Sequence, residues 1–119
     1  MIPNTISKTK TAALLIAVLG GCTTIDRQIE GWPQLTVRKH EMTFFEVQGK
    51  CWRHMPTAYK LLGGVALACA EVNLDAGTCD IYHLRNPSKV DIEHEESHCN
   101  GGDHDGILQK YFDRWKKGG

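Results

Sequence analysis

The chain contains an eleven-residue histidine motif that requires a helix followed by a sharp turn. The segment from His94 to His104 reads H-E-x-x-H-x-x-G-x-x-H. Residues four apart lie one turn above each other on an α-helix, so His94 and His98 share one face. Gly101 allows the backbone to turn past the helix end, which lets His104 return as a third ligand. Three imidazoles with a fourth position left open form the ligand set of a catalytic zinc site.

The residues around the motif predict where that helix begins and ends. Ser88 provides an N-cap, and Asp91 falls in the first turn, where a negative charge is favourable. The glycines at 101 and 102 then interrupt the helix. We therefore expect a helix over residues 88–99, with the third histidine in the loop beyond it.

The segment from His94 to His104 resembles the signature of the zincin metallopeptidases in its longer, metzincin form. This resemblance covers eleven residues and implies that the three histidines bind zinc. It also implies that Glu95 takes a proton from water and passes it to the leaving amine. The methionine turn of metzincins has no counterpart after the motif, because every methionine of the chain precedes it. We therefore expect a minimal zincin-like domain.

Other side chains have candidate roles in that chemistry. A hydrolytic site needs a second donor for the oxyanion. The candidates by residue type are Tyr82, His83 and Tyr111, and we choose Tyr111. Asp103 is the alternative third ligand if His104 does not reach the metal. Asp103 and Asp105 otherwise flank His104 and are candidates to orient an imidazole from behind.

The N-terminus has the pattern of a bacterial export signal. Lys8 and Lys10 precede an apolar run over residues 12–19, which is too short to cross a membrane as a helix. The sequence Leu-Gly-Gly-Cys at 19–22 resembles the bacterial lipobox. That resemblance implies cleavage before Cys22 and diacylation of its sulfur. A plain secretory signal or an uncleaved anchor is the alternative interpretation.

These features divide the chain into three expected parts. Residues 1–21 are the signal peptide, 22–33 are the lipidated cysteine and a tether, and 34–119 are the zincin-like domain. Contact with the membrane would then be made through the N-terminal lipid. Thr23 differs from the aspartate that marks inner-membrane retention in enteric bacteria, so we expect an outer-membrane lipoprotein that faces the periplasm.

The four cysteines that follow Cys22 predict two disulfides. Cys51, Cys69, Cys79 and Cys99 are an even number, and the expected compartment oxidises thiols. A domain of this size buries little apolar surface and needs crosslinks. Three pairings are open, and the turn-rich residues between Cys69 and Cys79 favour that bond together with Cys51–Cys99.

The remaining patterns predict an α+β fold with a small antiparallel or mixed sheet. Expected strands are 65–72 and 79–84, which form a hairpin, and 35–37 and 42–47, which form a second pair or one bent strand. Expected helices are a short one over 56–62 and an amphipathic one over 105–116. We assign the apolar face of the last helix to the core.

The combined features favour a lipid-anchored, zinc-dependent peptidase that acts on a peptide or protein. The charges of fourteen basic and fourteen acidic residues cancel, so we expect no nucleic-acid partner. We also expect the protein to be a monomer. One alternative is a non-catalytic lipoprotein that is stabilised by zinc and binds a protein partner. A further alternative is a metal-dependent endoribonuclease, because residues 94–104 also resemble the H-x-x-x-H-x-x-x-x-x-H site of bacterial enzymes that mature ribosomal RNA. Glu95 and the export signal favour peptide hydrolysis.

Overall fold

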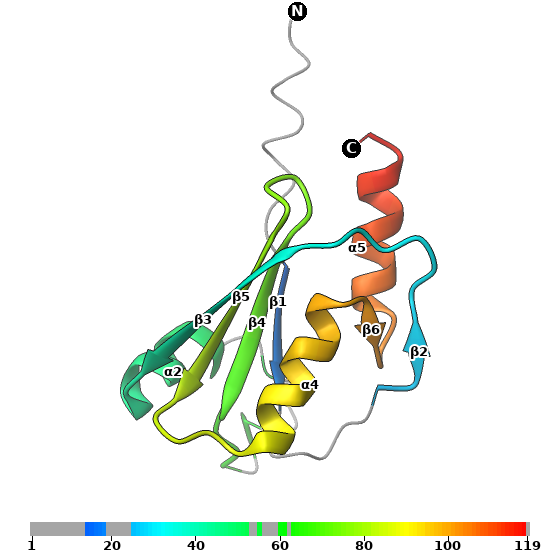
Figure 1. Cartoon of the computed structure of the whole chain (residues 1–119). Coiled ribbons are helices and arrows are strands. Elements are labelled where there is room, and N and C mark those ends of the chain that lie inside the picture. The colour runs from blue at the N-terminus through cyan, green and yellow to red at the C-terminus, as the bar shows by residue number, and fades with distance from the viewer. Residues whose placement is uncertain (1–13, 19–24, 53–54, 56–59, 62, 119) are drawn as a thin grey trace, which may run out of the picture.

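A sheet of four strands forms the centre of the molecule, in the order β1-β4-β5-β3 (Figure 1). Its strands are β1 (Leu14–Val18), β3 (Thr36–Met42), β4 (Ala68–Asn73) and β5 (Thr78–Leu84). β1, β4 and β5 are antiparallel neighbours, whereas β3 lies parallel to β5. The structure, a computed structural model, describes residues 14–18, 25–52, 55, 60–61 and 63–118. The expected α+β class with a small mixed sheet is confirmed.

The predicted hairpin is formed by β4 and β5. In the turn between them, the Asn73 side chain accepts a hydrogen bond from the Ala76 N–H at 3.0 Å, and Gly77 has a φ of 73°. An asparagine acceptor and a glycine with positive φ are typical of tight turns. The register places Val72 directly opposite Cys79, so these two side chains lie on the same face of the sheet.

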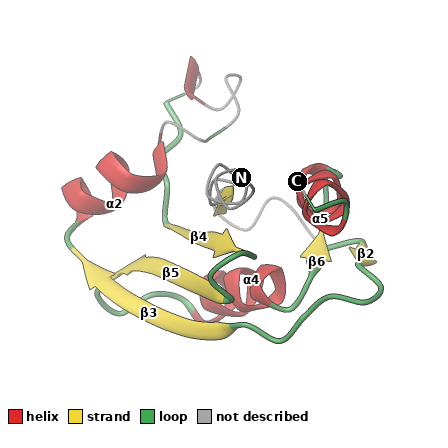
Figure 2. Ribbon diagram, turned by 90° about the horizontal axis from the view of Figure 1, so that it is seen from above, coloured by secondary structure: helices red, strands yellow, loops and turns green. Residues whose placement is uncertain are grey.

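Helices cover both faces of the sheet (Figure 2). α4 (Lys89–Cys99) packs against β4, β1 and β5, whereas α2 (Phe44–Cys51) covers the opposite face. α5 (Ile107–Lys116) lies against the short strand β6 (Gly102–Asp103). The expected helices over 88–99 and 105–116 are therefore confirmed as α4 and α5.

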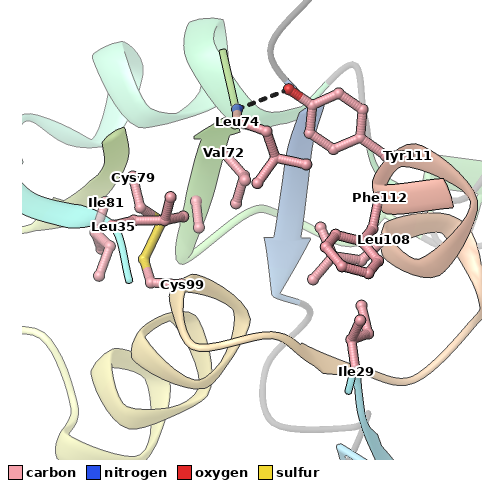
Figure 3. Packing of buried hydrophobic residues seen from close by; sticks show 11 residues of the cluster. Ile29, Leu35, Val72, Leu74, Cys79, Ile81, Cys99, Leu108, Tyr111 and Phe112 are labelled. Atoms are coloured by element: carbon pink, nitrogen blue, oxygen red, sulfur yellow. Dashed lines mark hydrogen bonds between the residues drawn. A yellow bond between two sulfur atoms is a disulfide. The ribbon is translucent and has the colours of Figure 1, made fainter. Parts of the chain in front are cut away.

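Each face of the sheet has its own apolar core. The larger core lies on the α4 side (Figure 3) and is built from Ile29, Leu35, Ala70, Val72, Leu74, Cys79, Ile81, Cys99, Leu108, Tyr111 and Phe112. The smaller core lies on the α2 side and is built from Val47, Cys51, Met55, Ala66, Cys69 and Tyr82. The buried residues of α5 belong to the larger core, as expected from its apolar stripe.

Residues 42–47 begin a helix, and the expected strand there is wrong. The Thr43 hydroxyl accepts a hydrogen bond from the Glu46 N–H at 3.3 Å, and the Glu46 carboxylate accepts one from the Thr43 N–H at 2.9 Å. This reciprocal capping satisfies backbone donors at the helix start. It ends β3 at Met42 and starts α2 directly afterwards.

The cysteines pair differently from the expected Cys69–Cys79 and Cys51–Cys99 bonds. Cys51 is bonded to Cys69, and Cys79 is bonded to Cys99. On the β4–β5 ladder Cys69 lies opposite Tyr82, whereas Cys79 lies opposite a residue three positions further along β4. An odd separation puts the two sulfurs on opposite faces of the sheet, so they cannot bond. The observed bonds tie α2 to β4 and α4 to β5.

The segment expected to be a tether is folded from residue 25 onward. β2 (Arg27–Gln28) pairs antiparallel with β6 (Gly102–Asp103). The Ile29 side chain is buried, and the Trp32 indole N–H donates to the Cys99 carbonyl at 2.8 Å. These contacts are made with a loop, and loop contacts leave no periodic pattern in the sequence. Residues 25–33, which the sequence assigns to the tether, therefore pack against the rest of the domain.

Some expectations fall on residues outside the described ranges. They concern most of the predicted signal peptide, Cys22 with its predicted lipid, and most of the predicted helix over 56–62. β1 is the described part of the predicted signal peptide. None of the helices in the described ranges has both the length and the apolar content needed to cross a membrane.

Candidate metal centre

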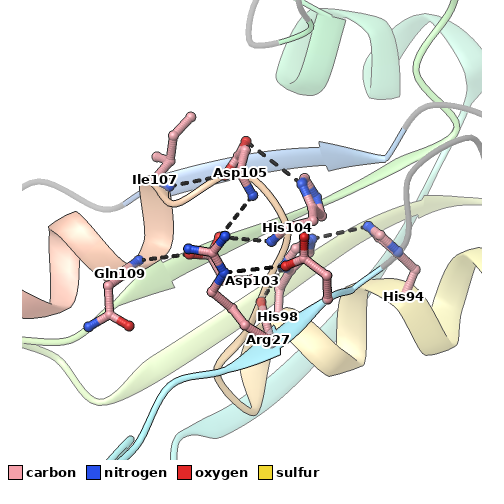
Figure 4. Close-up of polar contacts among 10 residues, drawn as sticks. Arg27, His94, His98, Asp103, His104, Asp105, Ile107 and Gln109 are labelled. Atoms are coloured by element: carbon pink, nitrogen blue, oxygen red, sulfur yellow. Dashed lines mark hydrogen bonds and ion pairs between the residues drawn. The ribbon is translucent and has the colours of Figure 1, made fainter.

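α4 holds two of the three motif histidines on one face of the helix, one turn apart. The Ser88 hydroxyl accepts a hydrogen bond from the Asp91 N–H at 3.0 Å, which caps the helix as predicted. His94 lies six residues after this cap, and His98 follows one helical turn later on the same face. Their Nε2 atoms are 3.1 Å apart (Figure 4).

The loop after α4 turns back through two glycines that occupy crowded positions. Gly101 has a φ of 91°, and a Cβ there would lie 2.7 Å from Cγ of Trp32. A Cβ on Gly102 would lie 2.9 Å from the Ser97 carbonyl oxygen. Only glycine fits both positions without displacement of its neighbours. β6 then pairs with β2, and this pairing brings His104, the next residue after β6, to the other two histidines.

The three histidines converge on one point. Each offers a ring nitrogen, and these nitrogens all lie within 4.8 Å of one another. Nitrogens about 2.0–2.1 Å from a tetrahedral zinc ion are about 3.3 Å apart. The 3.1 Å separation between His94 and His98 is close to that value. His94, His98 and His104 therefore form a group that could hold a metal ion, as the motif predicts.

A backbone carbonyl orients the His98 ring from behind, and a carboxylate lies near the His104 ring. Nδ1 of His98 lies 2.7 Å from the Gly102 carbonyl oxygen and donates a hydrogen bond to it. In this neutral tautomer Nε2 carries no proton, so its lone pair is available to a metal ion. Nδ1 of His104 lies 3.8 Å from a carboxylate oxygen of Asp105. Nε2 of His104 is buried and has no hydrogen-bond partner within the described part of the chain. A buried nitrogen left in this way suits a metal ligand.

Asp103, the alternative third ligand, supports the loop instead. Its carboxylate accepts hydrogen bonds from the backbone N–H groups of His104 at 3.0 Å and Gln109 at 3.2 Å. Burial by itself raises the pKa of Asp103, but backbone N–H groups that follow it in the chain outweigh burial and hold the pKa below its ordinary value. The ionised carboxylate thus fixes the start of α5 and the backbone of His104.

The imidazoles of α4 are held in the neutral form that a metal requires. Burial lowers the pKa of His98 to about 3, and the neighbouring His94 and His104 add to this effect. Burial also lowers the pKa of His94, with a further contribution from His104. At neutral pH both rings keep a lone pair for a metal ion, with no proton to be displaced.

Glu95 is a buried carboxyl group without a local partner. Its side chain is 0% exposed, and neither of its oxygens has a hydrogen-bond partner among the residues described. Burial raises its pKa well above the ordinary value, and the nearby Asp91 raises it further. Buried carboxyl groups in native proteins are normally hydrogen-bonded, so this exception points to a role with water or a ligand.

Comparisons with protein-family profiles, with curated proteins and with solved structures find no match to this chain. The assignment of a metal centre therefore rests on the geometry of this chain alone. That geometry comprises the converging histidine nitrogens, the orphaned Nε2 of His104 and the unpaired Glu95 carboxyl.

The candidate oxyanion donors have structural contacts elsewhere. The Tyr111 hydroxyl accepts a hydrogen bond from the Leu74 N–H at 3.0 Å, inside the larger core (Figure 3). The Tyr82 hydroxyl donates to Glu71 at 2.9 Å, and His83 bonds the backbone of the next residue. We therefore do not carry Tyr111 forward as the oxyanion donor.

The sequence pattern missed the N-terminal strap, residues 25–32, which supports the loop of the third histidine. The Gln28 side-chain amide donates to the Asn100 carbonyl, and the Trp32 indole donates to the preceding carbonyl, that of Cys99. The backbone N–H of Ile29 donates to Gly101 at 3.0 Å. The sparse apolar residues of the strap are the sole sequence signal for this contact.

Replacement of Asp105 by asparagine is expected to weaken metal binding by about 10-fold, because partners behind a metal-bound imidazole typically contribute 10–100-fold. Asparagine keeps an acceptor for the Ile107 N–H, which Asp105 caps at 3.0 Å, and removes the charge near His104. Competition titration against a chelator measures the change. Asp113→Asn, on the exposed side of α5, is the control and should leave the affinity unchanged.

Proposed function

We propose that this protein is a zinc-dependent hydrolase of peptide or amide bonds. The observation that carries the proposal is the convergence of three imidazole nitrogens on the helix that also carries a buried, unpaired carboxyl group, Glu95. Three imidazole nitrogen donors suit zinc, and an open fourth position separates hydrolytic sites from purely structural ones. When bound, zinc supplies a Lewis acid and lowers the pKa of a water molecule towards neutrality.

Glu95 is assigned the proton transfers of this reaction. A general base works best when its pKa lies near the working pH, and burial moves the pKa of Glu95 in that direction. The carboxylate takes a proton from the attacking water and returns it to the leaving amine. The carboxyl oxygens of Glu95 are free for both transfers, because no side chain or backbone group of the described residues occupies them.

The proposed location is the bacterial envelope, with a lipid on Cys22 and the domain in the periplasm. Two disulfides support an oxidising compartment. The apolar run and the Leu-Gly-Gly-Cys sequence at 19–22 support export and lipidation. The strap begins close after Cys22, so the lipid would hold the metal centre near the membrane surface.

A chelator experiment tests the proposed reaction. We expect the oxidised protein to cleave members of an unbiased peptide library, to lose this activity in a chelator and to regain it with one equivalent of zinc. An RNA substrate, tested in parallel, should stay intact. Cleavage of RNA alone would favour the endoribonuclease alternative. Stoichiometric zinc without cleavage of either substrate would favour the non-catalytic lipoprotein.

A further inference from the structure

The edge of the central sheet is occupied by a strand that the sequence predicts to be removed. β1 lies wholly within the predicted signal peptide, residues 1–21. It pairs antiparallel with β4 along its whole length, from Leu14 opposite Val72 to Val18 opposite Ala68. Cleavage before Cys22 would therefore leave β4 as an edge strand.

That edge would be unusual, because the residues of β4 are mostly small, apolar and buried, as is typical of a strand inside a sheet. Ala68, Ala70 and Val72 are all 0% exposed, and the last two belong to the larger core. Natural edge strands are normally protected by charges, proline or a bulge. Within β4 only Glu71 carries a charge, and it is engaged by the Tyr82 hydroxyl at 2.9 Å. Removal of β1 thus exposes unpaired backbone groups beside an apolar surface.

From this we infer that the outer edge of β4 binds an extended, apolar segment of another polypeptide, and that β1 occupies its place in the uncleaved chain. Directly opposed residues of an antiparallel pair lie on the same face. Occupant residues opposite Ala68, Ala70 and Val72 would therefore face α4, on the side of the larger core that contains Ala70 and Val72. The sequence of β1, Leu-Leu-Ile-Ala-Val, is wholly apolar, and this composition is the pattern for the proposed occupant.

The site lies beside the candidate metal centre. α4, which carries His94 and His98, packs against both β1 and β4 (Figure 1). A bound strand would therefore run along the helix that presents the histidines. The inference goes beyond the proposed hydrolysis, because strand addition needs only backbone hydrogen bonds and apolar contact.

A second copy of the chain is a poorer occupant than a foreign strand. Two β4 edges that paired antiparallel around Glu71 would place the Glu71 carboxylates of the two copies opposite each other. Like charges on neighbouring strands are destabilising. A segment without acidic residues, such as that of β1, avoids this repulsion.

A strand-exchange experiment tests the inference on the folded full chain. A protease site is inserted after Gly21, the chain is folded and oxidised, and the leader is then cut and removed by dilution. The probe is a fluorescent synthetic peptide of residues 12–20 with terminal lysines for solubility. We expect saturable binding and renewed hydrogen-exchange protection of the β4 amides. Use of the Glu95→Gln variant in a chelator makes this result independent of any hydrolysis.

Two N-methylated peptides provide the matched controls. One is methylated at Leu14, Ile16 and Val18, and the other at Leu15 and Ala17, so side chains are kept and alternate N–H donors are removed. In an antiparallel ladder only alternate residues donate to a given neighbour. One peptide should therefore bind at least about 10-fold more weakly, and the other should bind like the parent. Equal binding of both peptides would contradict the inference, as would no binding, dimerisation of the cut protein, or its unfolding when the leader leaves.

Discussion

Replacement of His98 by alanine is expected to abolish stoichiometric zinc binding. His98 is fully buried, and its Nε2 faces that of His94 while its Nδ1 is fixed by the Gly102 carbonyl. Loss of a direct ligand should weaken binding by more than the roughly 100-fold upper limit seen for partners behind a ligand. Zinc at about 100 times its dissociation constant should raise the free energy of unfolding of the wild-type protein by about 2.7 kcal/mol. The same zinc concentration should not stabilise the variant. Titration calorimetry and thermal unfolding with and without zinc measure both effects.

His83→Ala is the matched control for that experiment. His83 lies on β5 and bonds the backbone of Leu84 at 2.8 Å, outside the histidine group. It should therefore keep the zinc affinity of the wild-type protein. If His98→Ala also kept that affinity, or if both variants lost it equally, the assignment of the ligand set would be wrong.

Replacement of Glu95 by glutamine is expected to remove hydrolysis and to leave zinc binding intact. General-base catalysis typically contributes 10²–10⁴-fold, so cleavage of any substrate found in the peptide library should fall by at least about 100-fold. Zinc content should stay at one equivalent, because Glu95 is not in the histidine group. Turnover and metal analysis on the same samples measure the two quantities.

The neighbouring glutamate offers a control with the same chemistry. Glu96 is partly exposed and pairs with Lys39 at 2.7 Å. Glu96→Gln should retain turnover and should change the free energy of unfolding by at most about 1 kcal/mol, the usual range for exposed ion pairs. A Glu95→Gln variant that turned over normally would remove Glu95 from the mechanism.

The same substitution should change how the metal-free protein responds to pH. Below pH 4.5, the ordinary pKa of this group, Glu95 is protonated in the folded and the unfolded chain alike. Above it, the unfolded chain releases the proton at a lower pH than the folded chain, so stability falls as pH rises towards the raised pKa of the folded state. Glutamine has no such proton, and the histidine contributions are common to both proteins. The advantage of Glu95→Gln should therefore grow from near zero at pH 4 to about 1–3 kcal/mol at pH 8, as denaturant unfolding in a chelator can measure.

The histidine group could be predicted because its geometry is mostly local. Residues four apart on a helix meet by helical geometry alone, and Ser88 and the glycine pair mark the ends of α4 in the sequence. Even the return of His104 follows from a turn within a few residues. The hairpin of β4 and β5 and the amphipathic α5 are local in the same sense, since periodicity and turn residues define them.

The contacts that complete the site depend on residues far apart in the chain. The face that a cysteine takes on β4 or β5 is set by the register between strands, and a shift of one residue reverses it. The strap contacts Gly101 from more than seventy positions upstream. It does so through backbone hydrogen bonds, which any residue type can form and which the sequence therefore does not reveal. The helix after Met42 depends on one reciprocal cap between Thr43 and Glu46. The sequence by itself determined which side chains form the candidate centre, because spacing along one helix and one turn brings them together. Only the tertiary structure decided what buries and orients them, because burial and register arise from pairing between distant segments.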